Sequence, residues 1–406
     1  MHNMGKAWVS DSWWGSEYNW VDDVVGKFEL PDDIQFHDAT LRDGEQCPGV
    51  VFRKEAKVEI AKLLDSIGID RIEAGMPTVT EEDFEAIKEI TKLGLKASIM
   101  LFCRAHPDDI EKAIETGASG LILEVPSGYP RIKNQFPQWT YDDIKQRAID
   151  SIVYAKKKGF FVTFFPYDTT RAEESYLKSL MTEVVEKAKP DSVAVIDTIG
   201  CALPQAIYYM VKKVRSWVNV PVEIHTHNDF GMGVATSLAA VQAGAKVVHG
   251  CLTGLGERTG NTALEQVFVA LSSLMNVELP RIKMKLLYEA CKRVSELSKI
   301  PIPINAPVTG DVAFAREIGL GTKLFKTAPT TLFPVAPTFL NREPRLVLGK
   351  KSGKDSVKVK LEMMNIAIPE EIIPDIVQEI KARSTEKGTY LDDSEFTQIL
   401  RDLKAI

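Results

Sequence analysis

The sequence is poor in cysteine and contains no long apolar run. Its five cysteines are scattered and no two form a Cys-x-x-Cys pair, which argues against a disulfide framework and against a structural zinc site. No apolar run approaches the roughly 20 residues that a membrane span needs, and the polar, aromatic N-terminus is unlike a secretory signal. We therefore expect a soluble protein of the reducing cytoplasm, with no membrane partner.

Positive charge is not in excess either, since 50 Lys and Arg stand against 56 Asp and Glu. The net charge of −6 leaves no electrostatic footprint for nucleic acid, so a small-molecule partner is expected. With 45% hydrophobic and 26% charged residues, the composition is that of an ordinary globular protein. A chain of 406 residues exceeds what one core usually serves, which predicts one large domain with appended elements.

A short apolar run followed by a longer amphipathic segment recurs from residue 34 to 275. The eight apolar runs cover residues 34–38, 70–76, 96–102, 120–125, 160–165, 192–197, 222–227 and 246–251. Alternating strands and helices force parallel strands with right-handed crossovers, and eight such units match a closed (β/α)8 TIM barrel. An open doubly wound sheet would want a glycine-rich phosphate loop after its first strand, and "LRDGEQCPG" is not one.

We predict that the barrel occupies residues 34–280. Residues 1–33 form an N-terminal extension that holds four of the six tryptophans. Residues 281–345 read as a linker and helical subdomain, rich in proline after residue 300. Residues 346–406 read as a small C-terminal domain of two or three helices. In a barrel of this kind the chemistry lies at the C-terminal ends of the strands and in the loops that follow.

Residues 225–227 read His-Thr-His at the end of the seventh predicted strand. Side chains alternate along a strand, so His225 and His227 point the same way, as two ligands of one metal must. Two histidines satisfied by hydrogen bonds inside the barrel are the alternative.

Two polar loops at the same end of the barrel favour the metal. The loop after the first strand carries Asp38, Arg42, Asp43, Glu45 and Gln46, although Asp38 or Asp43 could instead cap a helix. The glycine-rich loop 251–261 after the eighth strand carries Glu257, Arg258 and Asn261. Aspartate, histidine and asparagine together suit a divalent cation with open positions, which would act as a Lewis acid on an oxoacid.

Five motifs follow one another along the predicted barrel: "DATLRDGEQCPGV", "IEAGMP", "DTIG", "HTHNDFGMGVATSLAAVQAGA" and "GLGERTGN". In this order they resemble the DRE-TIM metallolyases, the metal-dependent superfamily of isopropylmalate, homocitrate and citramalate synthases and hydroxymethylglutaryl-CoA lyase. The segment "LVLGKKSGKDS" resembles the synthase branch. The resemblance implies that Asp43, His225 and His227 bind Mn2+, Mg2+ or Zn2+, with Asn261 in or near the shell.

The resemblance also implies roles for residues around the metal. Arg42 would face the oxygen on which negative charge develops, a role suited to a fixed guanidinium. Thr198 matches a threonine that hydrogen-bonds the oxoacid carboxylate. Gln46 and Glu73 fall at substrate-pocket positions.

The fifth strand departs from the family pattern. The synthases carry Arg-x-Ser-x-Glu-Asp here, but Thr163 replaces the arginine and Tyr167 the glutamate, while Asp168 and Arg171 match. We expect Arg171 to bind substrate. Loss of the substrate-reading arginine makes 2-oxoglutarate a poorer guess than oxaloacetate, pyruvate or another oxoacid.

A second departure concerns proton transfer. In the synthases a segment like "FAHESGIH" supplies a catalytic histidine to the neighbouring subunit, and a tyrosine follows. Here Arg316 and Gly321 stand at the histidine positions and Leu332 stands near the tyrosine. Neither Gly321 nor Leu332 can take a proton. Tyr167, Glu257 or His106 could replace them, or the reaction is not the usual condensation.

Three functions remain open. The first is condensation of an acyl-CoA, expected to be acetyl-CoA, with a 2-oxoacid to a 2-hydroxy di- or tricarboxylic acid, with Arg42, Tyr167 and Glu257 as catalytic residues and a homodimer as the assembly. The second is the reverse chemistry, a lyase that cleaves a 2-hydroxy acid or its CoA ester. The third is a paralogue without turnover that binds an oxoacid, which the intact metal set disfavours.

Overall fold

The computed structural model describes residues 6–319, 321 and 324–406. Eight parallel strands close into a barrel in sequence order, because β1 pairs with β2 on one side and with β8 on the other. They are β1 (Gln35–Asp38), β2 (Arg71–Glu73), β3 (Ser98–Arg104), β4 (Gly120–Pro126), β5 (Phe161–Tyr167), β6 (Ser192–Asp197), β7 (Val222–Thr226) and β8 (Val247–Gly250). The predicted (β/α)8 barrel is confirmed.

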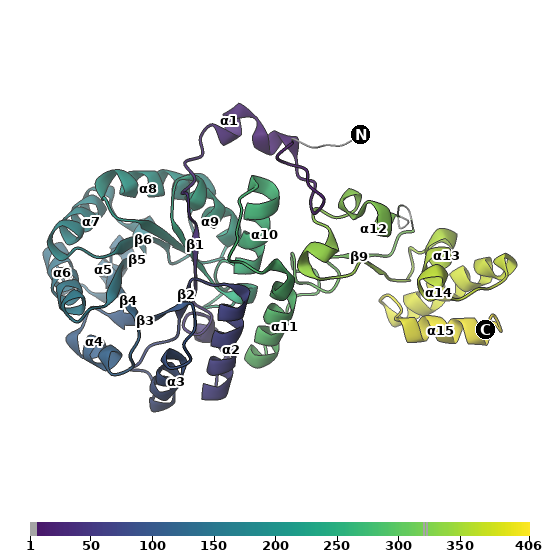
Figure 1. The fold of residues 1–406 in the computed structure, drawn as a ribbon, viewed down its shortest axis with the longest axis horizontal. Coiled ribbons are helices and arrows are strands. Elements are labelled where there is room, and N and C mark those ends of the chain that lie inside the picture. The colour runs from purple at the N-terminus through teal and green to yellow at the C-terminus, as the bar shows by residue number, and fades with distance from the viewer. Residues whose placement is uncertain (1–5, 320, 322–323) are drawn as a thin grey trace. The chain divides into compact units, whose positions relative to one another are not determined.

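Helices alternate with the strands and surround them (Figure 1). They are α2 (Lys54–Ile67), α3 (Glu81–Thr91), α4 (Pro107–Ile114), α5 (Tyr129–Gln135), α6 (Tyr141–Lys157), α7 (Glu174–Ala188), α8 (Pro204–Trp217), α9 (Gly233–Gln242), α10 (Leu264–Met275) and α11 (Leu287–Ser298). None of the helices in the described ranges combines the length and the apolar character needed to cross a bilayer.

Local sequence signals set where these helices begin and end. The hydroxyl of Thr140 accepts a hydrogen bond from the backbone N–H of Asp143, whose carboxylate accepts from the N–H of Thr140, so α6 begins with a capping box. Helix α2 ends at Gly68, whose φ is +94°. A Cβ there would lie 1.9 Å from the carbonyl oxygen of Arg281, so this turn requires glycine.

The barrel interior carries buried charge as well as apolar packing. Glu223 accepts from Arg71 at 2.6 Å and pairs with Nε2 of His249 at 2.6 Å. The ring of His249 stacks on that of His37, with ring centroids 4.1 Å apart. Removing one partner of such a network leaves an uncompensated buried charge, so these contacts specify the interior strongly. An apolar cluster lines the barrel nearer the strand ends: Met100, Phe102, Ile122, Phe165, Ala194 and Ile196.

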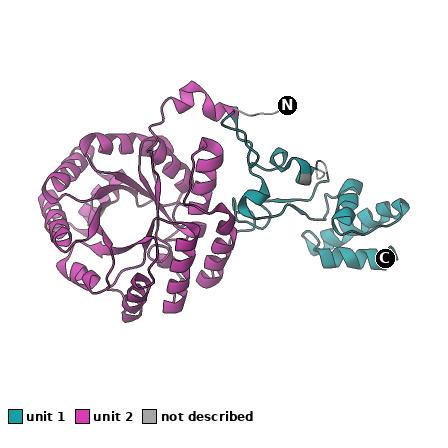
Figure 2. Cartoon of the chain, viewed as in Figure 1, with its two compact units in different colours: residues 1–16, 303–406 teal, residues 17–302 magenta. Residues whose placement is uncertain are grey.

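The chain divides into two compact units: unit 1 holds residues 1–16 and 303–406, and unit 2 holds residues 17–302 (Figure 2). Unit 2 contains the barrel, including the predicted barrel range 34–280. In unit 1, Trp13 bridges to Val335 and its ring meets that of Phe339 edge-on. The helices α13 (Lys354–Met363), α14 (Ile373–Lys387) and α15 (Asp393–Asp402) pack around a common apolar core in the same unit.

Candidate active site

A cavity of about 260 Å³ opens among the C-terminal ends of the barrel strands. Apolar side chains of the barrel, such as Phe102 and Phe165, form part of its wall. Eight of the residues predicted from the sequence also line it: Arg42, Asp43, Gln46, Tyr167, Thr198, His225, His227 and Glu257.

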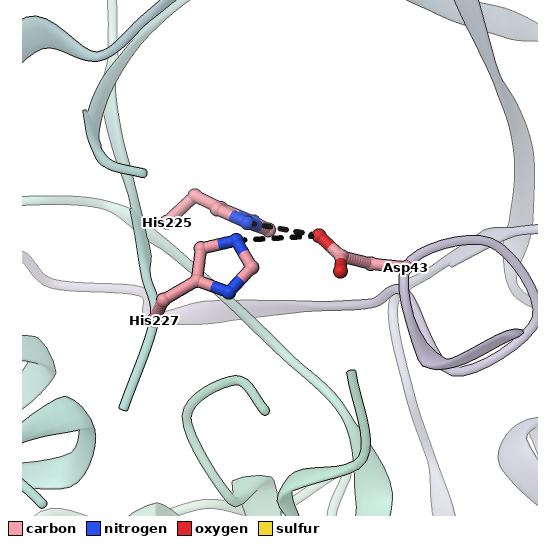
Figure 3. A group of neighbouring side chains, drawn as sticks. All are labelled: Asp43, His225 and His227. Carbon is pink, nitrogen blue, oxygen red and sulfur yellow. Dashed lines mark ion pairs between the residues drawn. The ribbon is translucent and has the colours of Figure 1, made fainter. Parts of the chain in front are cut away.

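Asp43, His225 and His227 meet in this cavity (Figure 3). His225 lies on β7 and His227 directly follows it, while Asp43 lies in the turn after β1. Oδ2 of Asp43 is 3.3 Å from Nε2 of His225 and 3.7 Å from Nε2 of His227. Their candidate ligand atoms all lie within 4.8 Å of one another, which is the spacing of ligands around a single ion.

The protonation states of this triad suit a cation. Burial lowers the pKa of His225, and it lowers the pKa of His227 to about 4, so both imidazoles are neutral at neutral pH, the form that ligates metals. Burial alone would raise the pKa of Asp43, but Arg42 and the two histidines outweigh it and hold that carboxyl well below its usual range. The site therefore offers two neutral nitrogens and one carboxylate.

Two buried oxygens near the triad make no hydrogen bond within the described part of the chain. They are Oδ1 of Asp43 and Oδ1 of Asn261, whose amide nitrogen donates to the carbonyl oxygen of Leu255 at 3.2 Å. Asn261 also bridges to the backbone of His227. Leaving a buried polar atom without a partner is costly, and a divalent cation would satisfy such oxygens. The residues present therefore fit a divalent metal.

The loop after β8 requires glycine at position 256. Gly256 has a φ of +159°, and a Cβ there would lie 2.1 Å from the amide nitrogen of Asn261. The neighbouring Glu257 is about half exposed, with a side-chain exposure of 52%, and pairs with Arg258. Arg258 also pairs with Asp229 after β7 and donates to the carbonyl oxygen of Thr198 at 2.6 Å, so it ties three loops together.

Arg42 is buried and held on two sides by carboxylates. Its Nε donates to Oε1 of Glu73 at 2.6 Å and its Nη1 to Oδ2 of Asp43 at 3.0 Å. Its guanidinium carbon lies 4.2 Å from the centre of the Phe102 ring. Burial alone would lower the pKa of Arg42, but Glu73 and Asp43 reverse that effect and raise it. A fixed positive charge therefore stands beside the triad.

Glu73 lies behind Arg42 and is fully buried. Its second oxygen pairs with Nε2 of His37 at 3.0 Å. It is not among the described residues that line the cavity, so its contacts orient Arg42 and its predicted substrate contact stays a prediction.

Thr198 and Arg171 occupy different surroundings. Thr198 lines the cavity, and its hydroxyl accepts from the backbone N–H of Asp168 at 2.8 Å. Arg171 forms a two-pronged pair with the carboxylate of Asp168, at 2.8 and 2.7 Å, and is absent from the described lining of the cavity. A substrate role for Arg171 stays a prediction.

The residues at the two departures from the synthase pattern make defined contacts. Thr163 is fully buried inside the barrel, where its hydroxyl meets that of Ser192 at 2.9 Å, two pleats before the end of β5. Gly321 and Leu332 belong to unit 1, and a Cβ on Gly321 would lie 3.2 Å from Cδ2 of Leu332.

Sequence reasoning missed Glu124. It lies on β4 and lines the cavity together with Arg42 and Tyr167. In the sequence it is the single acidic residue of the apolar run "GLILEVP", and that interruption was the available signal.

Residues 33–297 match the family model described as HMGL-like. The homocitrate synthase AksA of Methanopyrus kandleri is 36% identical over 384 residues, which cover 95% of this chain and 96% of that protein. The (R)-citramalate synthase CimA of Methanocaldococcus jannaschii is 39% identical over 370 residues, covering 91% and 74%. The 2-isopropylmalate synthase of the same organism is 37% identical over 384 residues, covering 94% and 73%.

Solved structures show the same barrel. The hydroxymethylglutaryl-CoA lyase of Pseudomonas aeruginosa superposes with a TM-score of 0.60 at 19% identity, covering 67% of this chain and 95% of that one. The HMG-CoA lyase of Brucella melitensis gives a TM-score of 0.59 at 17% identity, covering 66% and 100%. At these identities the likeness concerns the fold.

Proposed function

The chain belongs to the HMGL-like family of DRE-TIM metallolyases, and from this membership we propose that it condenses acetyl-CoA with a 2-oxoacid at the Asp43, His225 and His227 site. It is an acyltransferase of the isopropylmalate and homocitrate synthase type. The observation that carries the proposal is the buried triad beside the fixed guanidinium of Arg42.

The candidate metal ligands and Arg42 each have a task in this reaction. Asp43, His225 and His227 would hold the divalent metal, with Asn261 beside them, and the bound metal would supply Lewis acidity toward the carbonyl of the oxoacid. Arg42 faces the cavity and stabilises the negative charge that develops on oxygen during carbon–carbon bond formation.

The remaining contacts position the substrate and the guanidinium. Thr198 and Gln46 line the cavity, and their hydroxyl and amide would be the neutral groups that bind the oxoacid carboxylate. Glu73 positions Arg42 through two hydrogen bonds.

The reverse chemistry is the second candidate, since Gly321 and Leu332 replace the family histidine and tyrosine. A homodimer also remains part of the proposal, because the family resemblance implies that a segment of this kind crosses to the neighbouring subunit.

An assay of thiol release tests the proposal. Purified protein with Mn2+ or Mg2+ and acetyl-CoA is incubated with 2-oxoacids from glyoxylate to 2-oxoglutarate. We expect oxoacid-dependent release of free CoA, with oxaloacetate or pyruvate ahead of 2-oxoglutarate. Silence with every oxoacid, together with release of an oxoacid from a 2-hydroxy acid, would replace the synthase with the lyase.

A further inference from the structure

Glu124 stands on the wall between two cavities of the barrel. Besides the cavity with the metal triad, it lines a second cavity of about 310 Å³, and Tyr167 is shared by both. The second cavity has an aromatic and cationic wall, in which the rings of Phe136 and Trp139 stack with centroids 4.5 Å apart and Arg147 lies over Trp139. A thioester that enters through this cavity would meet Glu124 at the border of the triad cavity.

The carboxylate of Glu124 has no polar partner among the described residues. Within the described part of the chain it makes no hydrogen bond and no ion pair, unlike Glu73 and Asp109, which are held by arginines. Burial raises the pKa of Glu124 to about 7, and the positive charges around it only partly offset this. The charged and titratable groups that act on it are Arg42, Glu73, Arg104, Asp109 and Tyr167, and Arg131 lines the same cavity.

The other candidates for proton transfer are less suited. Burial raises the pKa of Tyr167 well above its usual range, so its phenol stays protonated at neutral pH and cannot act as a base. The side chain of Glu257 is half exposed and paired with Arg258. His106 caps the start of α4, is more than half exposed and lines the second cavity but not the cavity of the triad.

We propose that Glu124 is the catalytic base that removes a proton from the methyl group of the acyl-CoA, an inference that rests on the proposed condensation. A methyl C–H bond breaks, the proton moves to a carboxylate oxygen of Glu124, and the electron pair passes into the thioester enolate. The enolate carbon then bonds to the carbonyl carbon of the oxoacid, whose oxygen takes up negative charge beside Arg42. That oxygen is then protonated from solvent, to which Glu124 returns its proton, so the product carries a hydroxyl and the base is ionised again. Water cleaves the thioester afterwards and releases CoA.

The test compares the wild type with Glu124→Gln and Glu124→Asp. With the oxoacid that the wild type accepts, we expect Glu124→Gln to lose roughly 10²- to 10⁴-fold in kcat, the usual contribution of a general base. Wild-type kcat/KM should rise with pH through about 7, because the base must be ionised. Glu124→Gln should lose this rise with pH, and Glu124→Asp should keep it at a reduced rate. Metal content should be unchanged in both variants.

A control and a second readout keep the result specific. Glu115→Gln changes an exposed glutamate at the end of α4 and should retain wild-type kinetics. In D2O, the wild type with the oxoacid should catalyse the incorporation of deuterium into recovered acetyl-CoA or into the product. Glu124→Gln should not accelerate this incorporation. If the wild type condenses and Glu124→Gln does so within twofold with the same rise with pH, the assignment of the base is overturned alone. If the wild type releases no CoA with any oxoacid, the proposed function falls, and the base assignment falls with it.

Discussion

The guanidinium of Arg42 donates from Nε to Oε1 of Glu73 at 2.6 Å, and both side chains are buried. Glu73→Gln keeps the shape of this contact and removes its charge. Breaking one partner of a buried ion pair typically costs about 3–5 kcal/mol, so the thermal midpoint should fall. Activity should fall mainly in kcat, because a less fixed guanidinium stabilises charge poorly in the transition state.

Metal content separates this effect from damage to the triad. Glu73→Gln should bind metal as the wild type does, since Glu73 does not contact His225 or His227 in the described contacts. A variant with normal kcat and lowered thermal midpoint would restrict Glu73 to a role in stability.

The double variant His225→Ala, His227→Ala should lose the metal. Two of three candidate ligands disappear while the barrel strand β7 keeps its backbone pairing. Metal measured by mass spectrometry after dialysis should drop from one equivalent per chain to background, and circular dichroism should stay unchanged. His106→Ala, which alters an exposed histidine away from the triad, is the matched control and should retain its metal. Equal metal in both variants would contradict the assigned ligands.

Gly256→Ala should disturb Asn261. The added Cβ would lie 2.1 Å from the amide nitrogen of Asn261, so the amide or the loop must move. Changes around metal ligands typically weaken binding by about 10- to 100-fold, and we expect this range in a metal titration. Gly94→Ala is the control, because it also forces a side chain onto a positive φ, +65°, but meets nothing within 4 Å. Equal metal affinity in the two variants would remove Asn261 from the metal shell.

The ionisation of Glu124 should be visible in stability, independently of any substrate. Its folded-state pKa is about 7, against an ordinary 4.5, so the folded protein holds this proton more tightly than the unfolded chain. Stability therefore falls as pH rises from about 4.5 to 7 and then levels off. Glu124→Gln removes this loss, so relative to the wild type it should gain thermal stability between pH 5 and pH 8. A stability difference that does not change with pH would contradict the raised pKa.

The barrel and the metal triad are readable from the sequence because each depends on local periodicity. Strands and helices alternate at regular spacing, and His225 at the end of β7 and His227 just after it are two residues apart, which fixes their common side. The rule that strand ends gather at one face of the barrel predicts that the polar loop after the first strand lies beside the histidines, and the family resemblance singles out Asp43 within that loop.

Glu124 and Glu73 show what such patterns miss. In sequence, Glu124 is one acidic residue in an apolar strand, and only the closure of the barrel brings it near Arg42, 82 positions earlier in the chain. The family pattern predicts Glu73 as a pocket residue. Its separation from the cavity depends on the position of Arg42, which hydrogen-bonds to it and lines the cavity instead. Burial, and the depth at which a side chain lies in the barrel, are tertiary properties that the spacing of residues along one strand does not specify.

The most direct measurement titrates Mn2+ into chelator-treated protein and follows CoA release from acetyl-CoA with the preferred 2-oxoacid. The account predicts no release without metal, full activity at one equivalent per chain, and no recovery in Asp43→Asn, which lacks the carboxylate of the triad. Sustained CoA release from the metal-free protein, or full recovery of Asp43→Asn at one equivalent, would contradict it.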